Sequence, residues 1–156
     1  MKANEIMTET VFSINEDQSL GDAAKLMWEH DCGWLPVLAQ DGTVLAAITD
    51  RDITMSAYFN GGRLFDIPVS NAQSSSVVTC GETDDINDVE SIMQAHQVRR
   101  LPVVDEQDKL LGVISLNDIA VAYKSRKNGI SAKGLSDTLA AVCSHKHSST
   151  SMVAVA

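Results

Sequence analysis

Two short motifs contain residue types that could bind a phosphorylated or sugar-containing ligand. In the segment AAITDRDI, Thr49 precedes Asp52 by three residues, and in GVISLNDI, Ser115 precedes Asp118 by the same spacing. A hydroxyl at a helix N-terminus can cap the helix or meet a phosphate, because the free N–H groups there favour anions. A carboxylate can accept both hydroxyl protons of a ribose diol. The alternative interpretation is structural, since Thr or Ser followed three residues later by Asp is also a capping box.

Three arginines are candidates for binding phosphate. Arg51 lies inside the first motif, and Arg99 and Arg100 are adjacent in a chain with few cations. The planar guanidinium group suits bidentate contact with phosphate oxygens. The alternatives are that Arg51 is a solvated helix residue paired with Asp50 or Asp52, and that Arg99 and Arg100 form a surface strand end. We expect at least one of the adjacent pair to face a ligand cleft.

Charge and composition exclude several classes of partner. The 156 residues include 12 Lys+Arg and 21 Asp+Glu, for a formal net charge of −9. This charge argues against a nucleic acid polymer and an anionic membrane surface as partners. The longest apolar run, Val44 to Ile48, is too short to span a bilayer. The cysteines are odd in number, far apart and form no CxxC pair, so we expect reduced thiols and a cytoplasmic protein.

An internal duplication organises the chain. Residues 20–53 align without a gap on residues 86–119, at an offset of 66. The identical pairs include Met27/Met93, His30/His96, Leu35/Leu101, Pro36/Pro102, Ile48/Ile114 and Asp52/Asp118. A unit of this size buries too little surface to be stable alone, so we expect two copies to share a core.

Each copy predicts the same order of elements, β-α-β-β-α. We expect short strands at 10–14 and 76–80, strands at 35–38 and 101–104, further strands at 44–48 and 110–114, and helices that begin near 50 and 116. Ser19 and Asp85 are the expected N-caps of the first helices, each followed by Asp three residues on. The apolar face of the helix in copy one is predicted to be Leu20, Ala23, Ala24, Met27 and Trp28.

The predicted fold class is α/β, with two tandem β-α-β-β-α repeats packed with pseudo-twofold symmetry and a C-terminal helix. We divide the chain into repeat 1 at 1–59, a linker at 60–75, repeat 2 at 76–124, and a C-terminal helix with a flexible tail at 125–156. The last helix is expected over Ser131 to Cys143, with one apolar stripe made of Leu135, Leu139 and Val142.

The paired units and their two terminal motifs resemble a tandem pair of the CBS-domain family, a Bateman module, in stand-alone form. The resemblance covers residues 3 to 124. It implies two clefts that bind an adenine nucleotide, with AMP, ATP or NADH favoured over ADP or an S-adenosyl compound. In one cleft, adenine would lie against Thr8 to Phe12 and Cys32-Gly33. In the other it would lie against Ser74 to Val78 and Val98-Arg99. In either cleft, the phosphates would be met by Arg100 or Arg51.

The copies differ from each other and from the family pattern. Ala46 stands where the family prefers glycine, whereas Gly112 fits. Leu116 and Asn117 replace Asp50 and Arg51, and Trp34 stands where copy two has Arg100. We therefore expect clefts that are not equivalent.

Three functional hypotheses follow. The first is a regulatory module that senses an adenine nucleotide and signals to an unidentified effector protein. The second is a dimerisation scaffold with vestigial clefts, and the third is an enzyme with an unrecognised site. No catalytic motif occurs, so we expect no enzyme. We expect no metal either, because the spacing of Cys143, His145 and His147 fits no closed zinc site. We also expect a homodimer through helical faces that carry Ile53, Met55 and Tyr58.

Overall fold

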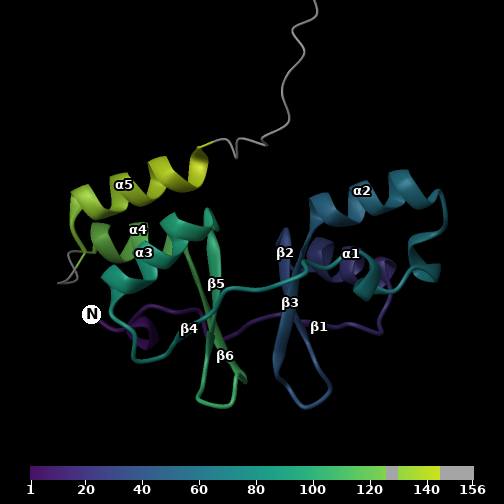
Figure 1. The fold of residues 1–156 in the computed structure, drawn as a ribbon, viewed down its shortest axis with the longest axis horizontal. Coiled ribbons are helices and arrows are strands. Elements are labelled where there is room, and N and C mark those ends of the chain that lie inside the picture. The colour runs from purple at the N-terminus through teal and green to yellow at the C-terminus, as the bar shows by residue number, and fades with distance from the viewer. Residues whose placement is uncertain (126–129, 145–156) are drawn as a thin grey trace, which may run out of the picture.

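The computed structural model describes residues 1–125 and 130–144, and it confirms the predicted pair of mixed α/β units. Figure 1 shows the two units side by side, with their hairpins adjacent and their helices on one side. The first unit contains β1 (Ile14–Asn15), α1 (Leu20–Glu29), β2 (Trp34–Leu38), β3 (Val44–Thr49) and α2 (Asp50–Asn60). The second contains β4 (Cys80–Gly81), α3 (Ile86–His96), β5 (Arg100–Val104), β6 (Leu110–Ser115), α4 (Leu116–Lys124) and α5 (Ala132–Cys143). Short 3-10 turns occur at η1 (Ala3–Glu5), η2 (Leu64–Asp66) and η3 (Val69–Asn71).

Both sheets have the same three-stranded topology. The strand orders are β1-β2-β3 and β4-β5-β6, with the first pair of strands parallel and the second pair antiparallel in each sheet. The first strands are shorter than predicted, because β1 begins only at Ile14 and β4 only at Cys80. β1 and β4 pair with β2 and β5 over two residues each, and Thr8, upstream of the predicted first strand, pairs with Val113 of the opposite sheet. The predictions of strands over 10–14 and 76–80 were therefore wrong in extent.

The helix caps explain where the helices begin. Ser19 and Asp22 form the predicted capping box, in which the Ser19 side chain accepts a hydrogen bond from the Asp22 N–H. Asp85 is the N-cap of α3, but it accepts a hydrogen bond from the N–H of Asn87 at N2. The expected box with Asp88 does not form, so that part of the prediction was wrong. Asp85 still satisfies one of the free N–H groups at the start of the helix.

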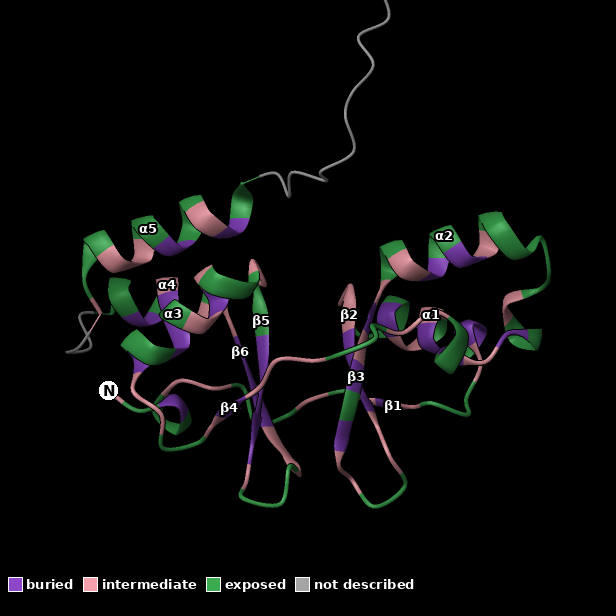
Figure 2. Cartoon of the chain, in the orientation of Figure 1, coloured by how far each residue is buried: buried purple, intermediate pink, exposed green. Residues whose placement is uncertain are grey.

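Each unit has its own buried core, visible as the purple stretches that face inward in Figure 2. The first core combines α1 residues with both long strands, and the second does the same around α3. Trp28, predicted on the buried face of α1, is 88% exposed. Ile53, expected on a dimer surface, is buried in the first core. We expected the two copies to share one core. The structure has two cores instead, because each repeat forms its own sheet.

The segment that enters each repeat crosses to the opposite repeat. Thr8 and Val113 exchange two backbone hydrogen bonds of 2.9 and 3.0 Å. At the equivalent place, the Ser74 N–H donates to the Ala47 carbonyl at 2.8 Å, and the Ala47 N–H donates to Ser74 Oγ at 3.1 Å. Ala3 is buried in the second core and its equivalent, Val69, in the first. This exchange ties the two small units into one structure.

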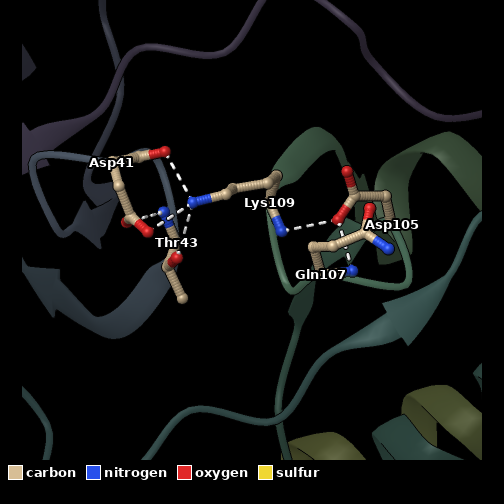
Figure 3. A network of polar contacts seen from close by, with 5 residues as sticks. All are labelled: Asp41, Thr43, Asp105, Gln107 and Lys109. Atoms are coloured by element: carbon tan, nitrogen blue, oxygen red, sulfur yellow. Dashed lines mark hydrogen bonds and ion pairs between the residues drawn. The ribbon is translucent and has the colours of Figure 1, made fainter.

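The hairpin tips form a second connection between the repeats (Figure 3). Lys109 Nζ lies 2.5 Å from Asp41 Oδ2, and it donates hydrogen bonds to the Asp41 carbonyl at 2.7 Å and to Thr43 Oγ1 at 3.0 Å. The Lys109 ammonium, with the Thr43 hydrogen bonds, holds the pKa of the Asp41 carboxyl well below its usual range. The N–H of Val44 also donates to the Asp108 carbonyl at 3.0 Å.

Within the described part of the chain, none of the helices has the length and apolar character that crossing a membrane requires.

Candidate functional site

The larger of two clefts at the seam between the repeats, which we call the first cleft, has a volume of about 790 Å³. This volume is within the usual range of small-molecule sites. One part of its lining comes from the β3–α2 junction of the first repeat. The other part comes from the crossing segment, the α3–β5 loop of the second repeat, and α5. Its lining includes Gly33, Trp34, Ala47, Thr49, Asp50, Arg51, Asp52, Ser74, Ser76, Val77, Val78, His96, Gln97, Val98, Arg99, Arg100 and Val142.

Thr49 and Asp52 lie together at the N-terminus of α2. Thr49 Oγ1 donates to Asp52 Oδ2 at 2.6 Å, and the Asp52 N–H donates back to Thr49 Oγ1 at 3.2 Å. The capping alternative from the sequence is therefore realised. The hydrogen bonds that the Asp52 side chain accepts within the described residues both reach Oδ2, so Oδ1 is available to a ligand hydroxyl. Capping holds the carboxylate in one orientation.

The three arginines all line the first cleft. Arg51 is the second residue of α2 in the first repeat. In the opposite repeat, Arg99 directly precedes β5 and Arg100 begins it. The predicted alternative of an ion pair with Asp50 or Asp52 does not occur: within residues 1–125 and 130–144, no carboxylate forms an ion pair with any of the three. All three side chains are exposed. The cleft therefore has an excess of cationic groups available to a ligand, although the chain as a whole is acidic.

Apolar side chains form another part of the lining of the first cleft, which we call the apolar wall. It consists of Val77, Val78, Val98 and Val142. Val142 is buried in the second core, and Val78 and Val98 pack against the same core. The cleft thus has hydroxyl, carboxylate and guanidinium groups from the β3–α2 junction and β5, and branched apolar side chains on the core of the second repeat. A ligand that joins a flat aromatic base to a polar extension fits a cleft with one polar and one apolar part.

The smaller, second cleft has a volume of about 300 Å³. Ser115 and Asp118 line it at the N-terminus of α4, with Ser115 Oγ donating to Asp118 Oδ2 at 2.5 Å. Arg100 is the one arginine among its lining residues. The remaining lining residues are Thr8, Thr10, Val11, Phe12, Cys32, Trp34, Val113 and Asn117. Phe12 stacks on His30 with ring centroids 3.5 Å apart, which engages one face of the ring.

The structure divides the predicted site residues between the two clefts as expected, except for Gly33. Thr8 and Phe12 line the second cleft with Ser115 and Asp118, while Val98 lines the first. Gly33 was expected beside Thr8 to Phe12, but it lines the first cleft, and its neighbour Cys32 lines the second. The Gly33 carbonyl accepts a hydrogen bond from the Asp50 N–H at 3.3 Å, which holds this residue against the start of α2.

Sequence reasoning missed some of the lining, chiefly Val142 with Gln97 and His96. Gln97 has a positive φ of 51° and ends α3, while its Nε2 donates to the Ala141 carbonyl of α5 at 3.1 Å. The C-terminal end of α5 is thereby held at the first cleft. The duplication gave no signal for Val142, because α5 has no counterpart in the first repeat. His96 is the last residue of α3, and the sequence marked it only as the counterpart of His30.

Other chemistry finds little support among the described residues. No group of three or more His, Cys, Asp or Glu side chains there could hold a metal ion. Cys143 is exposed, while His145 and His147 lie outside the described residues. Burial, with repulsion from Asp84, raises the pKa of the Cys80 thiol to about 12, so this group stays protonated at neutral pH.

Two tandem α/β repeats, joined by exchanged segments and with a cleft on either side of the seam, define the class of this molecule as a paired-repeat α/β module. The CBS domain family model matches residues 3–57 and 69–125, and the chain belongs to that family. It is 36% identical over 126 residues to the CBS domain-containing protein YhcV of Bacillus subtilis, covering 81% of this chain and 88% of that one.

Two solved structures share the fold. The CBS domain pair of protein MJ0100, solved with 5′-methylthioadenosine and S-adenosyl-L-methionine, superposes with a TM-score of 0.71 at 21% identity, covering 81% of this chain and 98% of that chain. CBSX2, solved in complex with AMP, gives a TM-score of 0.70 at 21% identity and also covers 81% of this chain and 98% of that chain. At this identity the likeness shows the fold alone. The ligands in these two structures all contain adenosine.

Proposed function

We propose that this protein is a regulatory module that binds a phosphorylated adenine nucleotide in the first cleft and signals its occupancy to an effector protein. The observation that carries the proposal is the first cleft itself. It combines a fixed Asp52 carboxylate for the ribose, three arginines without a described acidic partner for the phosphates, and a valine wall for the base. The adenosine-containing ligands in the two solved structures described above support the same ligand class.

The charge of the cleft favours a phosphorylated ligand over an S-adenosyl compound. Methylthioadenosine has no phosphate to meet Arg51, Arg99 and Arg100, and the sulfonium of S-adenosylmethionine carries a positive charge. The three arginines outnumber the two carboxylates in the lining, Asp50 and Asp52, so the cleft attracts phosphate oxygens more strongly than a cation. AMP, ADP, ATP and NAD(H) all satisfy this condition, and more than one phosphate would use more of the guanidinium groups.

We expect the second cleft to bind the same ligands more weakly. Its volume is less than half that of the first, and it has one arginine where the first has three. Trp34 occupies the position that is equivalent to Arg100, so a cation is lost on the side of the first repeat. The Phe12–His30 stack also places an aromatic ring where the first cleft has Val78.

We further propose a homodimer formed through one face of α2. Met55, Tyr58 and Phe59 are 41%, 77% and 75% exposed, and their spacing of three and four residues places them on one side of the helix. A contiguous apolar face of this kind is typical of an interface. We also propose that the protein is cytoplasmic, because its three cysteines are free. A measured mass equal to one chain in light scattering would reject the dimer.

Calorimetric titration with AMP, ATP, NADH and S-adenosylmethionine tests the nucleotide proposal. We expect Asp52→Asn to weaken nucleotide binding about tenfold, because it removes a charged hydrogen-bond acceptor for ribose. Asp118→Asn is the matched control, since it makes the same change in the second cleft, and we expect it to leave the tighter site unchanged. No heat from any ligand would favour the alternative, a dimerisation scaffold with vestigial clefts. Turnover of a nucleotide during the titration would instead indicate an enzyme.

A further inference from the structure

A groove between α1 and α2 has no role in the clefts' proposed chemistry. Its volume is about 660 Å³. The floor is largely apolar, with Met27 and Ile53 from the first core, and exposed polar side chains border it. The residues that line this α1–α2 groove are Ala24, Met27, Trp28, Asp31, Cys32, Gly33, Asp50, Ile53, Thr54 and Leu64.

The duplication shows what the equivalent groove of the second repeat holds. At an offset of 66, Ala24, Trp28 and Asp31 correspond to Glu90, Gln94 and Gln97. Those three residues contact α5, which packs on α3 and α4. Gln94 Nε2 donates to Thr138 Oγ1 at 2.8 Å, Thr138 Oγ1 lies 3.5 Å from Glu90 Oε1, and Gln97 Nε2 donates to the Ala141 carbonyl. The α1–α2 groove is therefore the counterpart of a surface that is covered by an amphipathic helix.

The course of the chain after α2 explains why the first repeat covers only one end of its groove. Gly61, at φ 62°, ends α2, and the chain turns into η2. Leu64 is equivalent at the offset of 66 to Ile130, which precedes α5, and each packs against the core of its own repeat. Phe65 packs over Gly21 of α1, where an added Cβ would lie 2.5 Å from the ring. The chain then crosses to β3 and the seam in place of continuing as a helix. Trp28, which lines the groove, is consequently 88% exposed.

The substitutions between the two grooves define the chemistry of an occupant. Where α5 meets Glu90 and Gln94 with a threonine, the α1–α2 groove has Ala24 and Trp28, so an apolar side chain fits there. Where Gln97 donates to the C-terminal carbonyls of α5, Asp31 can only accept. A lysine or arginine in the last turn of the occupant would pair with Asp31, a position where the helix dipole also favours a cation.

We propose that the α1–α2 groove docks an amphipathic helix of a partner protein, with an apolar residue against Ala24 and Trp28 and a basic residue in its last turn against Asp31. The site lies beside both clefts, because Gly33 and Asp50 also line the first and Cys32 also lines the second. It uses a face of α2 different from the one that carries Met55, Tyr58 and Phe59. The inference goes beyond nucleotide binding, and its test requires no nucleotide.

A peptide based on α5 provides the probe. Residues 130–144 are synthesised with Thr138→Leu and Ser144→Lys, and a second peptide carries Thr138→Leu alone. The protein is the full chain with Trp34→Phe, so that Trp28 is its remaining tryptophan. We expect a saturable change in Trp28 emission, with the lysine peptide binding about fivefold more tightly. Asp31→Asn should abolish that difference between the peptides.

Two variants of the protein separate docking from non-specific adhesion. Ala24→Gln gives the groove a side chain of the length found at Glu90, and we expect it to weaken binding at least tenfold. Val121→Gln, at an exposed apolar residue on α4 of the second repeat, is the control and should bind normally, with circular dichroism confirming that both variants fold. No saturable change up to about 1 mM peptide, or equal binding to Ala24→Gln, would overturn the proposal. It would also be overturned if Trp28 became buried without peptide as the mass of the protein doubled, because a second copy would then fill the groove.

Discussion

Thr43 and Lys109 are equivalent residues of the two repeats, and they pair with each other across the seam as an antiparallel bridge. The pseudo-twofold axis therefore passes between the hairpin tips at these two residues. A perfect repeat would place two identical side chains here. This chain has a hydroxyl on one side and an ammonium on the other, which lets Lys109 donate to Thr43 and to Asp41.

Removing this contact should weaken the association of the repeats. We expect Lys109→Met to lower the thermal midpoint by a few degrees, since the variant loses an ion pair and two hydrogen bonds between elements that are distant in sequence. Lys25→Met is the control, because the Lys25–Glu29 pair of 3.8 Å lies within one helix and is exposed. Scanning calorimetry at low and high salt measures both midpoints. Equal falls in the two variants would contradict a joining role for Lys109.

The close approach of the entry segment to β6 predicts that Gly112→Ala destabilises the protein. A Cβ on Gly112 would lie 3.0 Å from the Thr8 carbonyl oxygen and 2.7 Å from Met7 Sδ. The sulfur can move, but the backbone at Thr8 is held by its two hydrogen bonds to Val113. We expect a loss of about 1–3 kcal/mol in the free energy of unfolding, measured in urea. Gly62→Ala is the control, since the nearest atom to its added Cβ is 3.9 Å away. An unchanged Gly112→Ala variant would mean that the entry segment is not fixed on β6.

Val142 should matter for stability and for ligand binding together. Val142→Ala removes buried methyl groups from the second core and opens the apolar wall of the first cleft, so we expect a loss of about 1–2 kcal/mol and weaker nucleotide binding. Leu139→Ala, on the same helix but at a residue that is 50% exposed, is the control and should change both quantities little. Urea unfolding and calorimetric titration provide the two measurements. Normal affinity in Val142→Ala would place the ligand away from α5.

We expect the docking of α5 to depend on pH through Glu90. The side chain is buried, and burial raises the pKa of its carboxyl above the usual 4.5, a rise that the Thr138 hydrogen bond opposes and repulsion from Asp137 reinforces. A carboxyl with a higher pKa in the folded than in the unfolded state stabilises the fold when it is protonated. That contribution is present below the unfolded pKa and is lost as the pH rises through the folded pKa.

We therefore expect Glu90→Gln to be more stable than the natural chain at about pH 8, with a difference that shrinks toward about pH 4. The unfolding free energy of both proteins across this range gives the measurement. Asp137→Asn should reduce the difference in part, because it removes the neighbouring negative charge. A difference that is independent of pH would show that Glu90 does not titrate in this range.

The elements of each repeat could be predicted well because their signals are local. Ser19 and Thr49 begin helices through hydrogen bonds to residues three positions away, and the two LPV strands carry continuous apolar runs. The limits of the first strands were less predictable, because they depend on how far each strand pairs with a neighbour distant in sequence, and β1 and β4 pair over two residues each. The positions of Trp28 and Ile53 were predicted wrongly for a similar reason: periodicity marks an apolar face of a helix but does not say which of its residues another element covers.

The sequence by itself determined the duplication, the order of elements, and the Thr49–Asp52 and Ser115–Asp118 pairs, since these depend on residues close together or on a constant offset. Only the tertiary structure decided that Arg51, Arg99 and Arg100 share one cleft, that Gly33 faces that cleft, and that Val142 forms part of its wall. Those relationships arise from segments that cross between the repeats and from α5, which has no counterpart in the first repeat. Contacts between distant segments depend on how the units pack, and no local pattern of residues encodes that packing.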